Sequence, residues 1–383
     1  MLSDFAFAVI GAGISGLTIS RLIAEQLGKK VLIVEKRGHI GGNCHDCRGA
    51  DGILVHKYGP HIFHTDDKQV YDFLSRFTSW SNYQHRVLSF VDGIFVPFPI
   101  CGKTINMLLN LSLSTREIQT YLDSVRDRDR VIRNSEDVVL RDAGQLLYEK
   151  FFKNYTKKQW DAYPDELSPQ VISRIPIRTN DDDRYFTDKY QGMPTSGYSS
   201  MFGKMADHPN ISILLGADYR EHGLQAADKP AGLAVICTAP IDEYFGHSLG
   251  RLKYRSLDIR FESHNQESYQ PAAVVNYPND YDFTRITEYK KLTGEASEAT
   301  AISLEYPTWD GDPFYPVLDS TQQGKYAAYC EKAAKLENVF FLGRLGEYRY
   351  YNMDAAVAAA FSLFERLKQL NATQLAKLVE QKP

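Results

Sequence analysis

The sequence has little cysteine and almost no net charge, and both scarcities exclude classes of protein. Five cysteines in 383 residues are an odd number, and too few for a disulfide framework. The 44 basic and 48 acidic residues nearly cancel, leaving a formal net charge of -4. This balance predicts neither a nucleic-acid footprint nor a charged membrane surface. Any anionic ligand must therefore be held by a local cluster of basic side chains.

The sequence also lacks a long uninterrupted apolar run. Its apolar start over residues 5–19 is broken by Gly11, Gly13 and Gly16, ends at Arg21 and has no basic leader. This pattern predicts neither a membrane span nor a signal peptide, so we expect a cytoplasmic protein. With 43% hydrophobic and 24% charged residues, the chain can bury a sizeable core in two or three domains.

One cysteine pair has the spacing of a possible metal or redox site. Cys44 and Cys47 form a C-x-x-C, but no second pair stands at zinc spacing. We expect no bound metal and interpret both residues as free thiols in a loop.

The stretch "VIGAGISGLTISRLIAEQLGKKVLIVEKRGHIGGNCHD", which begins at Val9, predicts a dinucleotide-binding unit. Residues 5–10 form a short buried-strand run, residues 15–28 are typical of a helix, and residues 31–35 form a second strand. Together they make a compact βαβ unit with a glycine-rich first turn.

The glycines of this turn each have a physical reason. Gly11 permits the tight turn, Gly13 lets backbone amides approach a pyrophosphate, and Gly16 lets the helix pack closely on the strand. Glu35 ends the second strand 19 residues after Gly16, where a carboxylate can accept hydrogen bonds from ribose hydroxyls. We therefore predict dinucleotide binding, with a βαβ turn that serves packing alone as the alternative.

The residues after Glu35 favour FAD over NAD. Lys36 is followed by "HIGGNC", a second glycine turn containing Gly42 and Asn43, which resembles the extension found in FAD-binding flavoproteins such as amine oxidases. Near the C-terminus, a strand over residues 339–342, a glycine turn and an Ala-rich helix from about Met353 can return to the same sheet. The N-terminus of that helix would then face the flavin ring, and a helix that only packs is the alternative.

The rest of the chain predicts two further structural parts interleaved with the first. Residues 108–163 are rich in helix formers and indicate a helical insertion, with apolar side chains at helical spacing. Residues 252–306 alternate and are β-branched, as in an antiparallel sheet. "ISILLGADY" and "GLAVICTAPI" are typical of strands of the nucleotide-binding part.

The predicted fold class is α/β: a Rossmann-type FAD-binding domain with a helical insertion domain and a twisted antiparallel β-sheet domain. We assign the FAD-binding domain to residues 1–80, 206–247 and 319–383, the substrate sheet to 81–105, 181–205 and 248–318, and the helical domain with a mobile loop to 106–180.

Aromatic residues lie beside arginines in several turn-rich segments. "SRIPIR" holds Arg174, and its proline suits a mobile loop more than a helix. Each such residue taken alone is most simply structural. Their combination is informative because aromatic faces stack a base while arginines grip phosphates bidentately. A nucleotide-diphosphate substrate fits that combination.

Nine ordered blocks then carry a resemblance over nearly the whole chain. "HKYGPHIFHTDD", "FFKNYTKKQW", "SRIPIR", "YFTDKYQGMP", "LKYRSL", "FTRITEY", "EYP", "FYPV" and "GRLGEYRYYNMD" together resemble the bacterial UDP-galactopyranose mutase family. The resemblance implies bound FAD, homodimers, and interconversion of UDP-galactopyranose with UDP-galactofuranose. The product would be the galactofuranose donor for cell-envelope polysaccharides. We expect neither a nucleic-acid partner nor membrane insertion.

The resemblance also assigns roles residue by residue. Implied cofactor contacts are Gly11, Gly13, Gly16, Glu35, Lys36, Gly42, Asn43, Tyr58, Gly59, Pro60, Arg344, Asn352 and Met353. Implied substrate contacts are Phe151, Phe152, Tyr155, Thr156, Trp160, Arg174, Tyr185, Arg255, Asn276, Arg285, Tyr315, Tyr350 and His85. Arg174 and Arg285 would neutralise the diphosphate, and His61 and His64 would lie beside the flavin. Loop bracing is the alternative for both histidines.

The implied reaction is an isomerisation without net redox change. Reduced flavin N5 is nucleophilic, so a covalent sugar adduct at N5 of reduced FAD would hold C1 while the ring opens. Arg174 and Arg285 would stabilise the departing UDP. One departure is Asn352, a neutral amide where the resemblance leads us to expect aspartate. The competing readings are an oxidase of the amine-oxidase type and a binding protein like the GDP-dissociation inhibitors.

Overall fold

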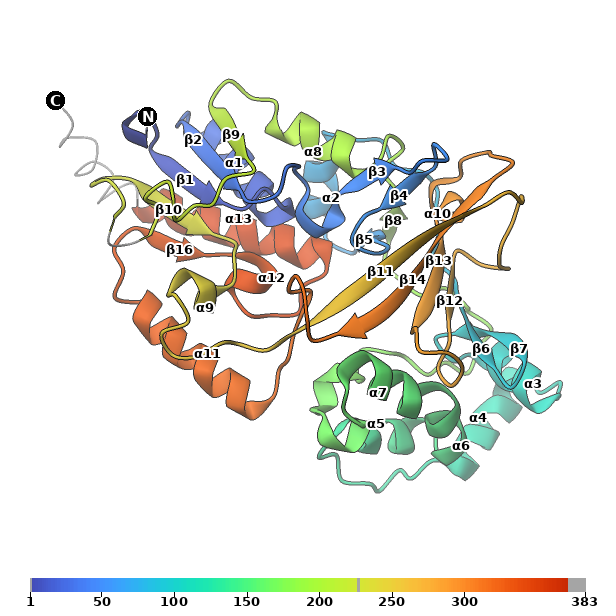
Figure 1. The fold of residues 1–383 in the computed structure, drawn as a ribbon. Helices are drawn as coiled ribbons and strands as arrows, with labels where there is room; N and C mark the ends of the chain where they lie inside the picture. The colour runs from blue at the N-terminus through green and yellow to red at the C-terminus, as the bar shows by residue number, and fades with distance from the viewer. Residues whose placement is uncertain (1, 226–227, 371–383) are drawn as a thin grey trace.

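The computed structural model describes residues 2–225 and 228–370, and it divides into three parts (Figure 1). The first part is a parallel sheet covered by helices, and both ends of the described chain belong to this part. A longer, mixed sheet extends from it, and a cluster of helices lies along one face of that second sheet. The predicted α/β class with a Rossmann-type domain is confirmed.

The parallel sheet has five strands in the order β16-β10-β1-β2-β9. Each neighbouring pair is parallel, and β1, β2 and β10 are buried along their whole length. Continuous apolar strands are expected where helices cover both faces of a parallel sheet. The strands are β1 (Phe7–Ile10), β2 (Val31–Glu35), β9 (Ile211–Leu215), β10 (Ala234–Cys237) and β16 (Val339–Phe341).

Two helices of this part pack directly on each other. Helix α1 (Ile14–Gln26) lies against α13 (Met353–Leu370), the last described helix, so segments near both ends of the described chain share one core. A side chain at Gly16 would place its Cβ 2.0 Å from the carbonyl oxygen of Gly11, so only glycine allows this helix to start so close to β1. Gly16 is therefore a packing residue.

The second sheet has seven strands in the order β15-β11-β14-β13-β12-β6-β7. Its longest pair, β11 with β14, is antiparallel as expected, but β12 pairs with β6 in parallel. The pairings within residues 252–306 are therefore antiparallel as expected, and the parallel pair with β6 makes the whole sheet mixed. The strands are β6 (Val87–Val91), β7 (Ile94–Phe98), β11 (Tyr254–His264), β12 (Val274–Asn276), β13 (Arg285–Glu288), β14 (Thr300–Thr308) and β15 (Tyr315–Pro316).

The helical cluster packs its apolar side chains against β6 and β7. It starts at Gly102, four residues before the expected boundary at 106, and it contains a π-helical turn at Tyr148–Lys153. Leu146, one of the apolar residues at helical spacing within 108–163, is exposed. The helices of the cluster are α3 (Gly102–Leu109), α4 (Thr115–Val125), α5 (Ser135–Asp142), α6 (Gln145–Leu147) and α7 (Asn154–Trp160).

Arg184 pairs with Arg86 beside β6, but residues 190–205 differ from their expected place in the substrate sheet. Strand β8 (Tyr190–Gly192) instead pairs with β5 (Phe63–Thr65) in a separate two-stranded sheet. Helix α8 (Tyr198–Ala206) packs on α1, and the buried carboxylate of Asp46 accepts hydrogen bonds from its first backbone N–H groups. These long-range contacts, which no local pattern encodes, draw the segment to the parallel sheet.

The other elements complete the parts already described. They are β3 (Asp46–Arg48), β4 (Leu54–His56), α2 (Lys68–Ser75), α9 (Ile241–Tyr244), α10 (Lys290–Thr293), α11 (Ser320–Ala333) and α12 (Gly343–Gly346). Of the expected C-terminal segment, residues 371–383 lie outside the described residues.

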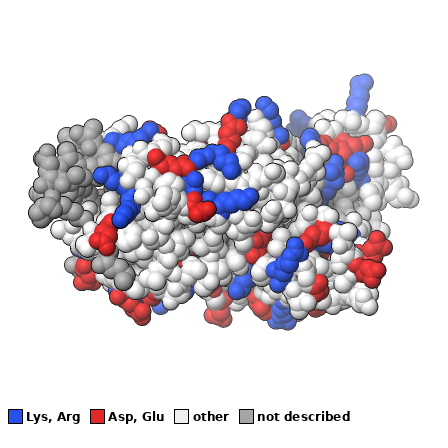
Figure 2. All heavy atoms as spheres, turned by 90° about the horizontal axis from the view of Figure 1, so that it is seen from above, with Lys and Arg blue, Asp and Glu red and all other residues white. Residues whose placement is uncertain are grey.

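On the face shown in Figure 2, basic and acidic side chains are interspersed. Over residues 2–225 and 228–370, none of the helices is both long and apolar enough to cross a membrane.

Candidate active site

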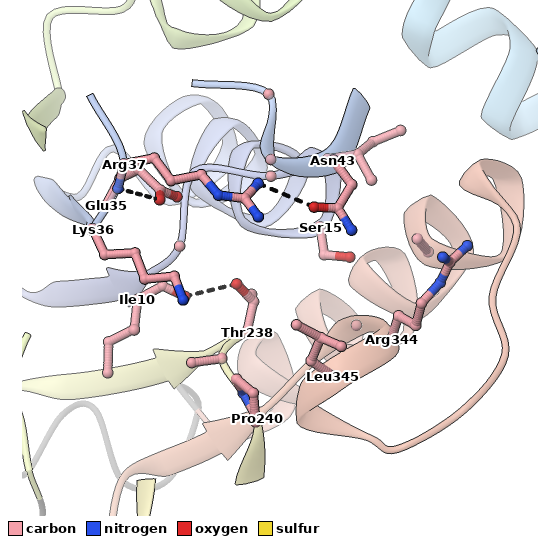
Figure 3. A pocket seen from close by; sticks show the side chains of 18 of the residues that line it. Ile10, Ser15, Glu35, Lys36, Arg37, Asn43, Thr238, Pro240, Arg344 and Leu345 are labelled. Atoms are coloured by element: carbon pink, nitrogen blue, oxygen red, sulfur yellow. Dashed lines mark hydrogen bonds between the residues drawn. The ribbon is translucent and has the colours of Figure 1, made fainter. Parts of the chain in front are cut away.

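A cavity surrounds the first turn of the parallel sheet, where β1 passes into α1 (Figure 3). We call it the glycine cavity. Gly11, Gly13 and Gly42 line it, and the ends of β2 and β10 and the start of α13 complete its wall. A side chain at Gly42 would come within 2.9 Å of Gly13 Cα, so the two turns touch through bare backbone. Such a glycine cradle leaves room for a ligand to approach the main chain.

The start of α1 fits a pyrophosphate. Gly13 caps the helix without any side-chain hydrogen bond, so the first amide groups of a 13-residue helix face the cavity unaided by a capping residue. These amides and the glycine cradle fit the phosphates of a dinucleotide. Together with the predicted cofactor residues Lys36, Asn43 and Arg344 in the lining, they would hold such a cofactor.

Glu35 lies at the end of β2, almost fully buried, in the lining of this cavity. Its carboxylate accepts hydrogen bonds from the backbone N–H groups of Ala12 and Arg37, both at 2.8 Å. The carboxylate is therefore fixed in orientation, and its remaining lone pairs can still accept from a ribose. Arg37 extends over the same rim and donates to Asn43 at 3.0 Å (Figure 3).

A second cavity adjoins the first, and its lining is rich in aromatic side chains. We call it the aromatic cavity. Its wall is built from the π turn and α7, the loop around Arg174, all seven strands of the mixed sheet and the segment after α12. The predicted substrate residues in its lining are Phe151, Phe152, Tyr155, Thr156, Trp160, Arg174, Tyr185, Asn276, Arg285, Tyr315, Tyr350 and His85.

The two cavities share part of their lining. Asn43, His61, Arg344, Asn352 and Met353 border both of them. A group bound in the glycine cavity therefore meets a group bound in the aromatic cavity at these residues. Asn352, which replaces the aspartate expected from the family resemblance, lies at this junction and contributes a neutral amide.

Two guanidinium groups and two tyrosine rings form a layered contact in the aromatic cavity. Arg174 lies 4.5 Å from the centre of the Tyr350 ring, and Arg344 lies 5.3 Å from it. The Tyr315 ring stacks on Tyr350 with centres 5.7 Å apart. Burial raises the pKa of Tyr350, but the nearby Arg174 and Arg344 outweigh it, so the pKa lies below its ordinary value. The local field therefore favours negative charge.

Arg285 begins β13 and forms a buried ion pair with Glu305 of β14. Its Nε donates to Glu305 Oε2 at 2.9 Å, and the other carboxylate oxygen has no hydrogen-bond partner in the described part of the chain. Burial raises the pKa of Glu305, while Arg285 opposes that rise. The pair holds the guanidinium in the cavity wall.

Three histidines near the junction are kept neutral by burial. Burial lowers the pKa of His56 to about 4, and it lowers the pKa values of His61 and His85 to about 3. His61 places Nδ1 2.9 Å from the carbonyl oxygen of Gly59, so Nδ1 carries the proton and Nε2 is an acceptor. Neutral histidines suit hydrogen bonding here, not charge compensation.

Most predicted site residues line one of the cavities, and two do not. Gly16 serves packing, as described above. Arg255 lies behind α7, where its Nε donates to the backbone oxygen of Gln159 at 2.9 Å, so it braces the wall and does not reach the cavity. Tyr58, Gly59 and Pro60, predicted as cofactor contacts, line the aromatic cavity.

Sequence reasoning missed two acidic residues near the aromatic cavity, Glu305 in its wall and Asp188 beside His64. Glu305 lies within the "EYP" block of the resemblance. A charged residue at an inward position of a strand rich in β-branched residues could have indicated it. Asp188, in "YFTDKY", offered no local signal.

The chain is similar in sequence to known proteins. Residues 150–350 match the family described as UDP-galactopyranose mutase, and residues 9–77 match an NAD(P)-binding Rossmann-like domain. A probable UDP-galactopyranose mutase of Klebsiella pneumoniae is 37% identical, covering 96% of this chain and 95% of its own. A dTDP-fucopyranose mutase of Escherichia coli is 35% identical, covering 92% of this chain and 95% of its own.

Solved structures share the fold. A crystal structure of reduced UDP-galactopyranose mutase superposes with a TM-score of 0.74, covering 98% of this chain and 97% of the other at 15% identity. A structure of a putative protoporphyrinogen oxidase gives a TM-score of 0.63 at 14% identity, covering 95% and 98%.

Proposed function

The chain belongs to the UDP-galactopyranose mutase family, and we propose that it interconverts UDP-galactopyranose and UDP-galactofuranose with FAD as its cofactor. The observation that carries the proposal is the shared wall of the two cavities. A flavin bound from the glycine cavity would present its ring at His61 and Arg344, where the aromatic cavity begins. The sugar of a nucleotide bound among the aromatic residues would meet it there.

The aromatic cavity fits a nucleoside diphosphate sugar by its chemistry. Phe151, Phe152 and Tyr155 offer faces for a base, while Arg174 and Arg285 supply charge-assisted donors for the diphosphate. Because the protein as a whole is slightly acidic, its net charge does not attract an anion over long range. The arginines must therefore bind the diphosphate through local contacts. They would stabilise UDP both as a bound group and as a leaving group.

Reduced FAD would supply a nucleophilic N5, at which we propose that the sugar is held covalently while its ring opens and closes. The residues of this chain then have defined tasks. Arg174 and Arg285 retain UDP, Arg344 faces the reduced ring, and His61 accepts a hydrogen bond at Nε2. The buried aromatic wall excludes water, which protects the open sugar.

Related proposals concern assembly and setting. We propose a homodimer that acts in the cytoplasm and supplies galactofuranose for cell-envelope polysaccharides, as the family resemblance implies. An oxidase of the amine-oxidase type remains the competing reading. It would need an apolar substrate cage, whereas the aromatic cavity has Arg174, Arg285 and Arg344 in its wall.

The test is an assay of the purified, dithionite-reduced protein with UDP-galactofuranose under anaerobic conditions, read by chromatography. Formation of UDP-galactopyranose supports the proposal. The relative that acts on dTDP-fucopyranose shares 35% identity, so dTDP-fucopyranose is run as a parallel substrate. Faster turnover of the dTDP-sugar would replace the proposed substrate, and hydrogen peroxide production with an amine would support the oxidase.

A further inference from the structure

Two imidazoles face the aromatic cavity from separate segments of the chain. His64 belongs to β5 and His85 lies two residues before the start of β6, and both line the cavity. The ring of Phe186 lies flat on His64, with centres 3.6 Å apart and planes inclined by 11°, and it also stacks near His85 at 6.0 Å. We call His64 and His85 the imidazole pair.

Each member of the imidazole pair has one ring nitrogen engaged by a residue outside the cavity lining. Asp188 Oδ1 lies 3.1 Å from His64 Nδ1, a close contact that is not aligned as a full hydrogen bond. The hydroxyl of Tyr83 lies 2.9 Å from His85 Nδ1 and is hydrogen-bonded to it. Neither Asp188 nor Tyr83 lines the cavity, so both act on the imidazoles from behind.

These contacts specify what the imidazoles present to a ligand. A carboxylate at Nδ1 favours the proton on that nitrogen, which makes Nε2 of His64 an acceptor. We take the Tyr83 hydroxyl as the donor to Nδ1 of His85, which leaves the proton on Nε2 and makes that atom a donor to a ligand. One acceptor and one donor, each on a ring that stacks with Phe186, complement two neighbouring hydroxyl groups of a sugar.

We propose that Asp188 and Tyr83 are positioning residues that orient the imidazole pair toward the sugar of the substrate. The proposal rests on the proposed function, because it takes the ligand of the aromatic cavity to be a nucleotide sugar. The diphosphate is assigned to Arg174 and Arg285, so the imidazole pair serves the sugar and not the nucleotide. Loss of either positioning residue should therefore affect sugar-dependent steps and spare UDP binding.

The test compares Asp188→Ala with a matched control, Asp66→Ala, at a residue that holds the same loop from the end of β5. Asp66 accepts a hydrogen bond from the backbone N–H of Lys189 at 2.7 Å, so Asp66→Ala loosens this loop without touching His64. For fully flavin-loaded, reduced Asp188→Ala we expect kcat/KM for UDP-galactofuranose to fall about 5- to 30-fold. The Kd for UDP should change by less than about twofold, and Asp66→Ala should resemble the parent protein. Tyr83→Phe should likewise lower kcat/KM while leaving the Kd for UDP nearly unchanged.

A second measurement reads the orientation directly. Nitrogen-15 spectra of the imidazole groups report which ring nitrogen of each histidine carries the proton. For His64 we expect the proton on Nδ1 in the parent protein and a mixture of both forms in Asp188→Ala. Equal losses of kcat/KM in Asp188→Ala and Asp66→Ala, a parallel loss of UDP affinity, or unchanged spectra would overturn the proposal. If the parent protein turns over no nucleotide sugar, the proposed function fails, while the spectra still decide whether Asp188 orients His64.

Discussion

Glu305 accepts a hydrogen bond from Arg285 Nε at 2.9 Å, yet its second oxygen is buried without a hydrogen-bond partner in the described chain. A fully buried carboxylate with one unused oxygen is costly unless its cationic partner remains in place. Arg285 therefore has two tasks. It neutralises Glu305 when the cavity is empty, and it can also interact with the negative charge of a bound diphosphate.

The first prediction concerns this pair. Glu305→Gln should lower the free energy of unfolding by about 3 kcal/mol in the absence of ligand, because it leaves a buried guanidinium without its anion. UDP should restore part of that loss by supplying another anion. Thermal unfolding with and without UDP checks this, and an equal UDP-induced shift in variant and parent would count against the shared role of Arg285.

The second prediction concerns the two diphosphate arginines. Arg174→Ala or Arg285→Ala should each remove about 2 to 4 kcal/mol of transition-state stabilisation, a loss of roughly 30- to 1,000-fold in kcat/KM. Lysine should rescue poorly at either position, because an ammonium lacks the planar fork of a guanidinium. Flavin content and folding serve as controls. An alanine variant that is fully loaded and reduced, yet keeps near-normal kcat/KM, would remove that arginine from the account.

The third prediction follows from Tyr350. Its pKa lies below the ordinary value because Arg174, Arg344 and Arg285 outweigh the effect of burial. Ionisation would place a phenolate beside the diphosphate, so UDP affinity should weaken as pH rises from 7 toward about 10. Tyr350→Phe cannot ionise and should keep a flatter profile. UDP titrations across this range test the point, which fails if the two profiles coincide.

The fourth prediction concerns stability in acid. His56 and His85 are buried, and burial lowers their pKa values to about 4 and about 3, from 6.5. Between these pKa values the two histidines are protonated in the unfolded state but not in the folded state. Their contribution to the free energy of unfolding is therefore complete above pH 6.5 and is lost as the pH falls toward 4. The slope should be up to about 1.4 kcal/mol per pH unit for each histidine. Urea unfolding between pH 7 and about pH 4 should show a shallower slope in His56→Gln, and an unchanged slope would contradict this assignment.

The fifth prediction tests the glycine cavity. Gly42→Ala should reduce flavin content, since its Cβ would meet Gly13 Cα at 2.9 Å and its φ of +56° disfavours a side chain. Gly203→Ala is the matched control, because a Cβ there meets nothing within 4 Å. Flavin absorbance per protein chain is the measurement. Full flavin content in Gly42→Ala would show that the cradle does not hold the cofactor.

Local patterns predicted those parts of the fold whose contacts are close in sequence. Strand Val31–Glu35 and the helix start at Met353 match the expected positions, because apolar periodicity and glycine turns act over a few residues. The parallel pairing of β12 with β6 was not predictable in this way. A single strand has the same local pattern whichever direction its neighbour runs, so pairing depends on distant segments.

The same limit applies to the site. Aromatic residues and arginines in ordered blocks indicated most of the aromatic cavity, since their chemistry is visible residue by residue. That Arg255 supports the cavity wall from behind was not predictable. Its position depends on a hydrogen bond to the backbone oxygen of Gln159 on α7, which is distant in the sequence. The contact of Asp188 with His64 likewise joins a loop to strand β5, far apart in the chain.

The central claim is that reduced flavin enables an isomerisation that consumes no reductant. The most direct measurement compares turnover of UDP-galactofuranose by oxidised and dithionite-reduced protein, with UDP-galactopyranose and flavin redox state followed together under anaerobic conditions. We expect many turnovers by the reduced protein, with the flavin still reduced at the end, and almost none by the oxidised protein. Equal turnover by both forms, or oxidation of one flavin for each product formed, would contradict it.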